Sequence, residues 1–525
     1  MDTKALRQKI LDLAIRGKLV PQDPNDEPAS VLLERIRAEK QQMVKDGKLK
    51  AKEIKNDTVI FLGDDNLHYE KFPDGTVKCI EDEIPFELPE GWEWTRLQAI
   101  CEPITDGTHK TPTYSDEGFI FLSSKNVTSG HIDWDNIMYI PESLHNELYA
   151  RLAPKKNDIL LAKNGTTGVA AIVDRDCIFD IYVSLALLRI IGYIISPEYL
   201  LSTIASSTIQ NYFNSSLKGI GVPNLHLEHI RTTLIPVAPI NEQYRIATKL
   251  EQLLSFADNI ESDKTDLQTT IQLAKSKILD LAIRGKLVPQ NPDDEPASVL
   301  LERIRAEKEE LIKQGKIKRD KKESVIFRGE DNSYYLRMGN LIETLDDWRI
   351  NDIPYSWGIC CLGEVCDYGN CTNVDTKDIP KTAWILDLED IEKDTGKVSQ
   401  KLTLKERNSA STKHSFHKGQ VLYSKLRPYL NKVVLVDDDG YCTSEILPLD
   451  FNKYILPEYA KYYLMSPTFL RYANHCSYGV KMPRLGTLDG RKAVLIVPPV
   501  NEQKRIADKV SQLFSLLDSI ADNVN

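Results

Sequence analysis

Long apolar runs and an excess of basic charge are both missing from this 525-residue sequence. No run approaches the roughly 20 apolar residues that cross a bilayer, and the opening "MDTKALRQKI" has no signal-peptide core. The nine cysteines form no paired framework, which predicts a cytoplasmic protein without membrane contact. The formal net charge of −10 argues against an extended surface that coats nucleic acid, although it leaves room for local basic patches.

Motifs of catalysis and metal binding are also missing. "NGTTG" at Asn164 lacks the Lys-Ser/Thr of a phosphate-binding loop, and "VPPV" at Val497 lacks the polar residue and the aromatic of an adenine methyltransferase motif. "DDDG" at Asp437 lacks the bidentate glutamate of a calcium loop. The cysteines nearest to one another do not have zinc-site spacing: Cys360, Cys361, Cys366 and Cys371. The sequence therefore predicts a chain that catalyses nothing alone and holds no metal.

What the sequence does contain is an internal repeat. Ile10–Lys40 and Ile278–Lys308 agree at 29 of 31 positions. A second pair, "PINEQYRIATKLEQLLSFADNI" from Pro239 and "PVNEQKRIADKVSQLFSLLDSI" from Pro499, has a different offset. In the middle of the chain the two blocks are continuous, whereas at the outside they are split between the two ends. This pattern predicts two homologous halves in a closed, pseudo-twofold arrangement in which the chain ends meet.

The central block has the 4-3 apolar spacing of a coiled-coil seam. The seam consists of Ile246, Leu250, Leu253, Ala257, Ile260, Lys264, Leu267, Ile271, Ala274, Ile278 and Leu281. The outer copy keeps the register through Ile506, Val510, Leu513, Leu517, Ile520 and Val524, then Leu6, Ile10 and Leu13. Gly285 and Gly17 are expected to end the two helices. A heptad run alone also fits a dimerisation coil or plain core, but the split duplication favours an antiparallel spacer within the chain.

A second helix should follow each copy, from Pro28 and from Pro296. Its charged residues fit a solvated face, or a surface on which each copy contacts the same kind of partner. Between the copies, Glu90–Val237 and Tyr355–Val497 carry short β-rich runs separated by turn signals. Each predicts a compact α+β domain with a curved sheet.

Several quoted stretches resemble one family when they are taken in order. They are "DGTHKTPTYSDEGFIFLSSKNV", "LLAKNGTTGVAAIV", "VPNLHLEHIRTTLIPVAPINEQYRI", "WILDLEDIEKDTGK" and "VLYSKLRPYLNKVVLVDDDGYCTSE". The ordered set, with two variable domains and split repeats, resembles the specificity subunit (HsdS) of type I restriction-modification systems over nearly the whole chain.

The resemblance implies an α+β fold in which two pseudo-twofold-related target-recognition domains are separated by two long antiparallel coiled-coil helices. The implied parts are an N-terminal half-repeat (1–57), a first recognition domain (58–237), a central repeat (238–323), a second recognition domain (324–497) and a C-terminal half-repeat (498–525).

The resemblance also implies partners. The recognition domains would each read one half of a bipartite double-stranded DNA sequence, and the repeats would dock two methyltransferase subunits, with restriction subunits bound through them. S-adenosylmethionine, ATP and magnesium would belong to those partners, and this chain would hold no cofactor. The alternatives are a stand-alone methyltransferase or endonuclease with divergent motifs, and a scaffold that binds only proteins.

Candidate DNA contacts come from local charge and from side chains suited to base edges. Between Lys401 and Lys432 there are eight Lys/Arg and one acid, which suits phosphate contact but also a solvated loop. The candidates of this stretch are Lys413, His414, Lys418, Lys425 and Arg427, the last two in a strand-like run that presents them on one face. Arg427 is our candidate for a guanine edge. Those of the first domain are Thr108, His109, Lys110, Lys125, Asn126, Lys163 and Asn164, although Asn164 equally fits a turn.

Overall fold

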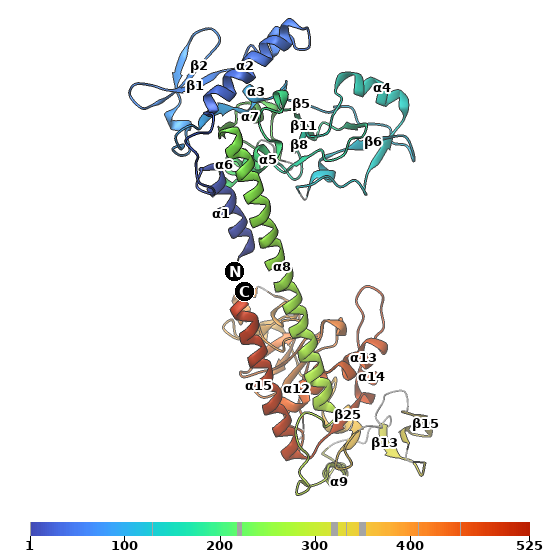
Figure 1. The fold of residues 1–525 in the computed structure, drawn as a ribbon. Coiled ribbons are helices and arrows are strands. Elements are labelled where there is room, and N and C mark those ends of the chain that lie inside the picture. Colours follow the sequence, from blue (N-terminus) through green and yellow to red (C-terminus); the bar gives the residue numbers. More distant parts are fainter. Residues whose placement is uncertain are drawn as a thin grey trace. The chain divides into compact units, whose positions relative to one another are not determined.

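The computed structural model describes residues 2–128, 130–217, 223–316, 324–331, 333–345, 353–407, 409–451 and 453–524. The chain divides into two compact units, Met1–Asp263 and Lys264–Asn525 (Figure 1). The boundary falls inside the central repeat, so each unit holds one copy of the 31-residue block and one of the two variable domains. Among the described residues no helix is both long enough and apolar enough to cross a membrane.

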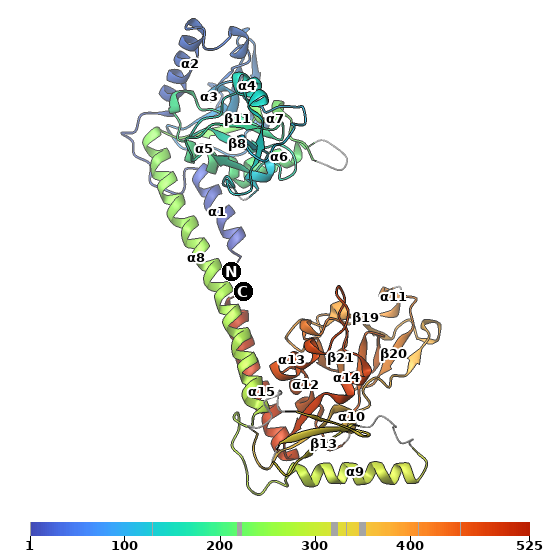
Figure 2. The same cartoon turned by 90° about the vertical axis from the view of Figure 1, so that its right-hand side faces the viewer.

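The long helix α8 (Ile240–Ile283) has 44 residues and supplies one half to each unit. In the first unit α1 (Thr3–Ile15) lies beside it in Figures 1 and 2. Arg7 pairs with Asp258 and the Thr3 hydroxyl donates to Glu261, so the two helices run antiparallel. The seam residues Ile246 and Ala257 are fully buried, as the heptad spacing predicts.

In the second unit α15 (Val500–Val524) takes the place that α1 has in the first. Lys275 of α8 forms an ion pair with Asp518 of α15. Farther along, Leu279 of α8 shares a buried core with Ile506 and Val510 of α15. The contacts again run in opposite directions along the two helices, so the expected antiparallel pairing is confirmed within each unit.

Both copies of the repeat end their first helix at a glycine with left-handed backbone. Gly17 (φ +62°) follows α1, and Gly285 (φ +67°) follows α8. A Cβ at Gly285 would lie 2.3 Å from Pro354 Cγ, so only glycine fits this close approach. The predicted helix ends are confirmed, and the expected second helices follow as α2 (Ala29–Lys45) and α9 (Ala297–Lys313).

The first turn of α8 ties the variable domain to the N-terminal segment. Trp92 Nε1 donates to Glu242 Oε2 (3.0 Å). The buried Gln243 side chain accepts one backbone N–H (3.0 Å) and donates to one backbone carbonyl (2.8 Å). Arg245 pairs with Asp26 of the loop between α1 and α2 (2.7 Å). We call these five residues the joint of the first unit.

The second unit has the same joint at the start of α15. Trp357 Nε1 donates to Glu502 Oε2 (2.9 Å), and Gln503 bonds the backbone on both sides (2.9 and 3.0 Å). Arg505 pairs with Asp294 (2.6 Å). The letters "NEQ" therefore occur twice because each unit builds one copy of this joint, to which the 31-residue block contributes Asp26 or Asp294.

A three-stranded antiparallel sheet follows the second helix in each unit. The first is made of β1 (Val59–Leu62), β2 (His68–Lys71) and β3 (Val77–Cys79). The second is made of β13 (Ser324–Arg328), β14 (Tyr334–Met338) and β15 (Leu341–Thr344). A two-stranded ladder then opens and closes each variable domain, β4 (Glu93–Arg96) with β12 (Leu234–Val237) and β16 (Gly358–Cys361) with β25 (Val494–Val497).

The variable domain of the first unit contains two sheets instead of the single curved sheet that we expected. The strand order of one is β5-β11-β8-β9, with bounds Thr105–Asp106, Leu185–Leu188, Ile159–Ala162 and Ala170–Ile172. The order of the other is β10-β6-β7, with bounds Phe179–Ile181, Phe119–Leu122 and Met138–Ile140. The reason is visible in β8, where Ile159 and Leu161 face the core shared with the helices while Leu160 and Ala162 face a second core. The helices of the domain are α3 (Leu97–Ile100), α4 (Glu142–Arg151), α5 (Pro197–Ala205), α6 (Ser207–Ser215) and α7 (Leu227–Arg231).

The variable domain of the second unit repeats this plan with other sheets. One has the order β17-β20-β23-β18-β19, with bounds Asn373–Val374, Lys413–Phe416, Gly440–Thr443, Trp384–Leu386 and Leu402–Thr403. The other has the order β22-β21-β24, with bounds Val433–Leu435, Val421–Ser424 and Ile446–Leu449. The helices are α10 (Leu362–Val365), α11 (Leu404–Arg407), α12 (Pro457–Met465), α13 (Pro467–His475) and α14 (Thr487–Lys492). The predicted α+β class is confirmed for both domains.

The hydrogen bonds of the joint predict that substitutions at two neighbouring tryptophans differ in their effect on the free energy of unfolding. Trp92 and Trp94 are 5% and 2% exposed, but only Trp92 donates a hydrogen bond, since Trp94 Nε1 has no partner among the described residues. Both Trp→Phe variants lose the same ring atoms, whereas Trp92→Phe also removes the donor to buried Glu242. We expect Trp92→Phe to be less stable than Trp94→Phe by about 1–3 kcal/mol in urea unfolding followed by circular dichroism. Equal losses would mean that this hydrogen bond contributes nothing.

Candidate nucleic-acid interface

In the first unit a loop after β8 lies against the segment before α7. Asn164 and Asn224 form an isolated antiparallel bridge, and the Leu225 N–H donates to the Lys163 carbonyl oxygen (2.9 Å). We call Lys163–Gly165 and residues 223–225 the first loop pair. The Oδ1 atoms of Asn164 and Asn224 are both buried and have no hydrogen-bond partner among the described residues. The pair therefore holds two amide groups whose acceptor capacity is unused.

The second unit has a loop pair with the same backbone contacts, Lys425–Arg427 and Pro483–Leu485. Leu426 bridges Arg484, and the Leu485 N–H donates to the Lys425 carbonyl oxygen (3.0 Å). In both units the lysine N–H donates to a carbonyl at the start of the neighbouring strand, Ser184 (2.8 Å) or Glu445 (3.0 Å). The two loop pairs are thus equivalent positions of the two domains.

By this correspondence, Arg427 occupies the position that Gly165 has in the first unit. Gly165 has φ +80° and Arg427 has φ +49°, so both are left-handed. An L-residue in this conformation costs about 1–2 kcal/mol, which glycine does not incur. The Arg427 N–H donates to the Pro483 carbonyl oxygen (2.7 Å), which holds the conformation. Arg427 Nε is buried and has no partner in the described part of the chain. Strained residues of this kind cluster at functional sites.

The other candidates of the first domain lie around the first loop pair. Asp106 is 2.5 Å from Lys163 Nζ and 3.2 Å from His109 Nε2, which brings the segment of Thr108, His109 and Lys110 to the loop. The Ser124 N–H donates to the Ser184 hydroxyl, which brings Lys125 there as well. His109, Lys110 and Lys125 are exposed and Thr108 is half-buried. Sequence segments far apart therefore converge on one surface, as a recognition site needs.

Two of these candidates have structural roles. Lys163 is 6% exposed and its ammonium is paired with the buried carboxylate of Asp106. Asn126 is 5% exposed; its side chain accepts from the Ser123 N–H (2.9 Å) and donates to the carbonyls of Asp133 and Asn136. Neither side chain reaches solvent with a donor or acceptor to offer, so this placement corrects the expectation that they contact DNA.

The basic stretch of the second domain also needs correction. Lys413 is 2% exposed and lies 3.5 Å from Asp387, and His414 Nδ1 lies 2.9 Å from the Ile446 carbonyl oxygen. Arg407 pairs with Asp390, and Lys401 with Asp437 (2.8 Å). Three of the eight basic residues are therefore paired with acids that lie elsewhere in the sequence. Lys413 and His414 are too buried to contact a phosphate. Lys418 is exposed.

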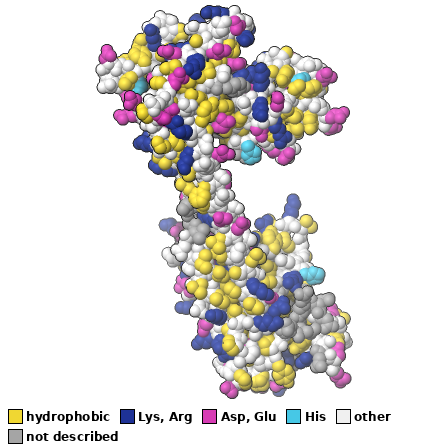
Figure 3. Space-filling view, in the orientation of Figure 1, with side chains coloured by type: hydrophobic (Ala, Val, Ile, Leu, Met, Phe, Trp, Pro, Cys, Tyr) yellow, Lys and Arg dark blue, Asp and Glu magenta, His cyan; other side chains and the backbone are white. Residues whose placement is uncertain are grey.

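Lys425 and Arg427 do not continue a strand, because β21 ends at Ser424. Both are half-buried residues of the second loop pair, and the expected one-face alternation is wrong for them. Their contact with DNA stays a prediction, now based on the loop pair. On the face of the second unit seen in Figure 3, several Lys and Arg side chains gather in dark blue.

A family model described as the type I restriction modification DNA specificity domain matches residues 89–268 and 354–524. The chain belongs to this family. The two matched segments are the two variable domains with the helices that follow them, so both loop pairs and all candidate contacts lie inside them. The curated relatives include the EcoAI specificity subunit of Escherichia coli, which is 31% identical over 70% of this chain and 63% of that protein. The chain thus spans less than two thirds of the length of that relative.

Two further comparisons agree. The EcoEI specificity subunit of Escherichia coli is 25% identical over 98% of this chain and 90% of that protein. A solved structure is also similar; its description concerns complex assembly and conformational transition of the type I R-M system. The match covers 84% of this chain and 94% of the chain in that structure. Its TM-score is 0.51 at 17% sequence identity, which supports the fold.

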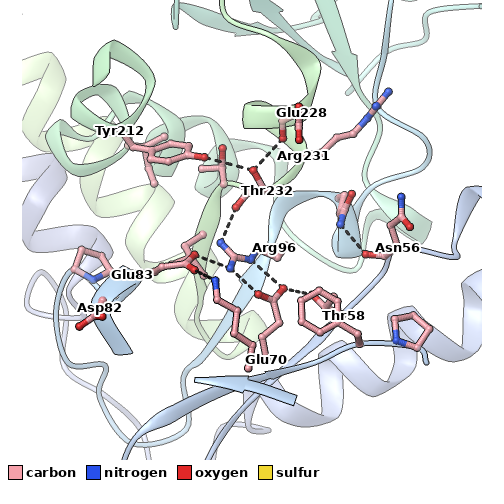
Figure 4. A pocket seen from close by; sticks show the side chains of 18 of the residues that line it. Asn56, Thr58, Glu70, Asp82, Glu83, Arg96, Tyr212, Glu228, Arg231 and Thr232 are labelled. Atoms are coloured by element: carbon pink, nitrogen blue, oxygen red, sulfur yellow. Dashed lines mark hydrogen bonds and ion pairs between the residues drawn. The ribbon is translucent and has the colours of Figure 1, made fainter. Parts of the chain in front are cut away.

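The first unit also contains a cavity of about 1240 Å³ between its three-stranded sheet and helices α6 and α7 (Figure 4). Arg96 crosses it and donates to Glu70 (2.7 Å), Glu83 (2.7 Å) and the Thr232 carbonyl oxygen (2.8 Å). Burial acts to raise the pKa of Glu70, but hydrogen bonds from Arg96 and Thr58 lower it below its ordinary value. Arg96 and Glu70 are buried and Glu83 is exposed, and the three charges pair with one another, so the ion pairs link the sheet to the variable domain. We assign the cavity no ligand.

No group of three or more metal-ligating side chains occurs in the part of the chain that the structure describes. The nine cysteines are free, and burial raises the pKa of the Cys360 and Cys361 thiols, which disfavours the thiolate needed to bind zinc.

At Arg427, two substitutions should separate the effect of the backbone on stability from the effect of the side chain on DNA affinity. Arg427→Gly and Arg427→Ala both remove the guanidinium, but only glycine relieves the left-handed backbone. We expect Arg427→Gly to exceed Arg427→Ala in stability by about 1 kcal/mol in urea unfolding. Both should lose about 1–3 kcal/mol of affinity for the cognate duplex, measured with methyltransferase partners present.

The reciprocal control is Gly165→Ala. Its Cβ would meet only Ser124 Oγ at 3.7 Å, so the cost, about 1 kcal/mol, should come from the backbone alone. If the two Arg427 variants are equally stable, Arg427 is not strained. Unchanged affinity in both would remove Arg427 from the interface.

Proposed function

We propose that this chain is the DNA sequence-recognition subunit of a type I restriction-modification complex. Its two domains read two unlike half-sites of a bipartite double-stranded target, and the chain has no catalytic activity of its own. It docks two methyltransferase subunits and, through them, restriction subunits. S-adenosylmethionine, ATP and magnesium belong to those partners, and the complex acts in the cytoplasm.

The observation that carries this proposal is a constant frame with different recognition loops. The joint has the same five residue types and the same hydrogen bonds in both units. The loop pairs share their backbone contacts but differ in side chains, Lys-Asn-Gly facing Asn224 in one and Lys-Leu-Arg facing Arg484 in the other. Equivalent positions with different hydrogen-bonding groups favour two different half-sites.

The chemistry of these side chains suits base edges in the major groove. An asparagine amide can bond adenine N6 and N7, and an arginine can bond guanine O6 and N7. We therefore assign a guanine contact to Arg427, whereas an adenine contact by Asn164 requires that its buried Oδ1 atom become exposed when DNA binds. The exposed Lys110, Lys125 and Lys418 suit phosphates, which position a protein on DNA without reading sequence.

Docking of the same partner twice is supported by apolar side chains that are exposed at equivalent positions. Val31 of α2 and Val299 of α9 are 39% and 41% exposed. Phe256 of α8 and Leu516 of α15 are 61% and 56% exposed, although each lies on a helix whose other face is packed. A surface that recurs in both units fits a partner present in two copies.

The proposal is tested by incubating the purified chain with labelled S-adenosylmethionine and DNA, alone and with its methyltransferase subunit. We expect methyl transfer only in the mixture, at a two-part sequence that methylation mapping identifies. Methyl transfer by the chain alone would favour a stand-alone methyltransferase, and DNA cleavage by the chain alone would favour an endonuclease. If the mixture methylates DNA without sequence preference, the result would favour a scaffold that binds only proteins.

The helices predict the distance between half-sites. Seven residues inserted after Asp263 in α8 and after Ser519 in α15 keep the heptad register and leave both joints unchanged. Each helix then lengthens by about 10 Å. The unread spacer of the target should grow by about 3 bp, since base pairs lie about 3.4 Å apart. Methylation mapping with the doubly extended chain measures this, and an unchanged spacer would argue against helices that set the distance.

A further inference from the structure

The second unit carries a short hairpin whose tip none of the functions above uses. It runs from Tyr478 to Arg484, between α13 and α14, which Figure 2 labels beside β21. Tyr478 and Arg484 form an antiparallel bridge in which each backbone N–H donates to the other residue's carbonyl oxygen (3.1 and 2.9 Å). Gly479 (φ +101°) lets the chain turn directly after the bridge.

The base of the hairpin is held firmly against the second loop pair. Arg484 bridges Leu426, and the Pro483 carbonyl oxygen accepts from the Arg427 N–H (2.7 Å). The Arg484 guanidinium forms a two-point ion pair with Glu445 (2.8 and 3.1 Å), and this hydrogen bonding lowers the pKa of Glu445. Arg484 therefore anchors the hairpin, and the hairpin in turn fixes the strained conformation of Arg427.

The tip of the hairpin is apolar and exposed. Val480 is fully exposed and Met482 is 49% exposed, and Tyr478 at the base of the hairpin is 64% exposed. Large apolar side chains on an exposed turn do not contribute to the core of their own domain. Such a tip is typical of a segment that packs against a partner.

The charge around the tip suits DNA. Residues 467–492 contain five Lys/Arg and one acid, Asp489. Lys481 lies at the tip between the two apolar residues, is exposed, and has no ion-pair partner among the described residues. Glu445, the acid at the base, is neutralised by Arg484. An apolar tip within a basic surface complements base edges surrounded by phosphates.

We propose that the hairpin Tyr478–Arg484 enters the major groove beside Arg427 and is a second base-reading element of this domain. Val480 and Met482 pack against base edges, of which the thymine methyl group is the apolar one, and Lys481 contacts a phosphate. The hydrogen bond between Arg427 and Pro483 places both elements in the same groove. This inference rests on the proposed function, because it assumes that the domain binds DNA.

The test compares two double variants of the full chain in complex with its methyltransferase subunits. Val480→Ser with Met482→Ser removes the apolar tip. Leu341→Ser with Ile342→Ser is the matched control, since these β15 residues of the same unit are 54% and 55% exposed. Affinity is measured for a duplex with the mapped target and for an unrelated duplex. Melting temperatures of both variants should equal that of the parent, because the side chains lie in solvent.

We expect the tip variant to bind the mapped target about tenfold more weakly and the unrelated duplex as the parent does. Replacing thymine by uracil in the second half-site removes the methyl group, and should weaken the parent but not the tip variant. Lys481→Ala should weaken binding to both duplexes alike and flatten the salt slope by about one unit. The control variant should match the parent throughout.

Parent-like binding by the tip variant, or an equal loss on both duplexes, would overturn base reading by the hairpin. Lys481→Ala binding as the parent does would overturn the phosphate contact. If the parent complex itself does not distinguish the mapped target from the unrelated duplex, the proposed function fails instead. The two failures are therefore distinguishable.

Discussion

The buried hydrogen bond between a tryptophan and the glutamate at the start of the following helix is the interaction on which each unit depends. Glu242 and Glu502 are 1% exposed, and burial raises the pKa of both carboxyls although the indole N–H of Trp92 or Trp357 acts against this. A buried carboxyl is costly unless it is bonded, so the tryptophan position and the first turn of the helix cannot change independently. The neighbouring Arg–Asp pair extends the same constraint to Asp26 and Asp294 of the repeat loops.

Buried positions near the joint, but outside it, carry different residues in the two units. The buried pair Arg96–Glu70 of the first unit corresponds to Cys361 and Leu336 in the second, where both pack in an apolar cluster. A paired charge and an apolar pair of residues fill equivalent places, as expected when a buried ion pair adds little net stability over apolar packing. The frame is therefore set by a few hydrogen bonds at the joint, and the rest of each domain can differ between the two units.

The sequence predicted the features that repeat along the chain and missed those that depend on distant partners. The heptad spacing identified Ile246 and Ala257 as buried, and Gly285 as the end of α8, because helix geometry is local. The same spacing wrongly placed Ile520, which is 46% exposed, in the seam. Lys163 and Lys413 were chosen as DNA contacts from residue type alone. Their partners Asp106 and Asp387 lie 57 and 26 positions away in sequence, so only the fold reveals the burial of these lysines. Likewise, counting the charges between Lys401 and Lys432 overlooked the acids that pair with Lys401, Arg407 and Lys413.

The loop pairs show how a constant frame can carry different side chains at equivalent positions. A turn after β8 or β21 requires left-handed backbone, which Gly165 adopts without strain. At the equivalent position Arg427 retains a side chain at a cost of about 1–2 kcal/mol, which is a large fraction of a domain's typical net stability of 5–15 kcal/mol. The cost is tolerated because the Pro483 carbonyl holds the turn and the Arg484–Glu445 pair holds Pro483 in place. A residue that strains its own backbone in one unit, where glycine serves in the other, is best explained by what its side chain contacts outside the chain.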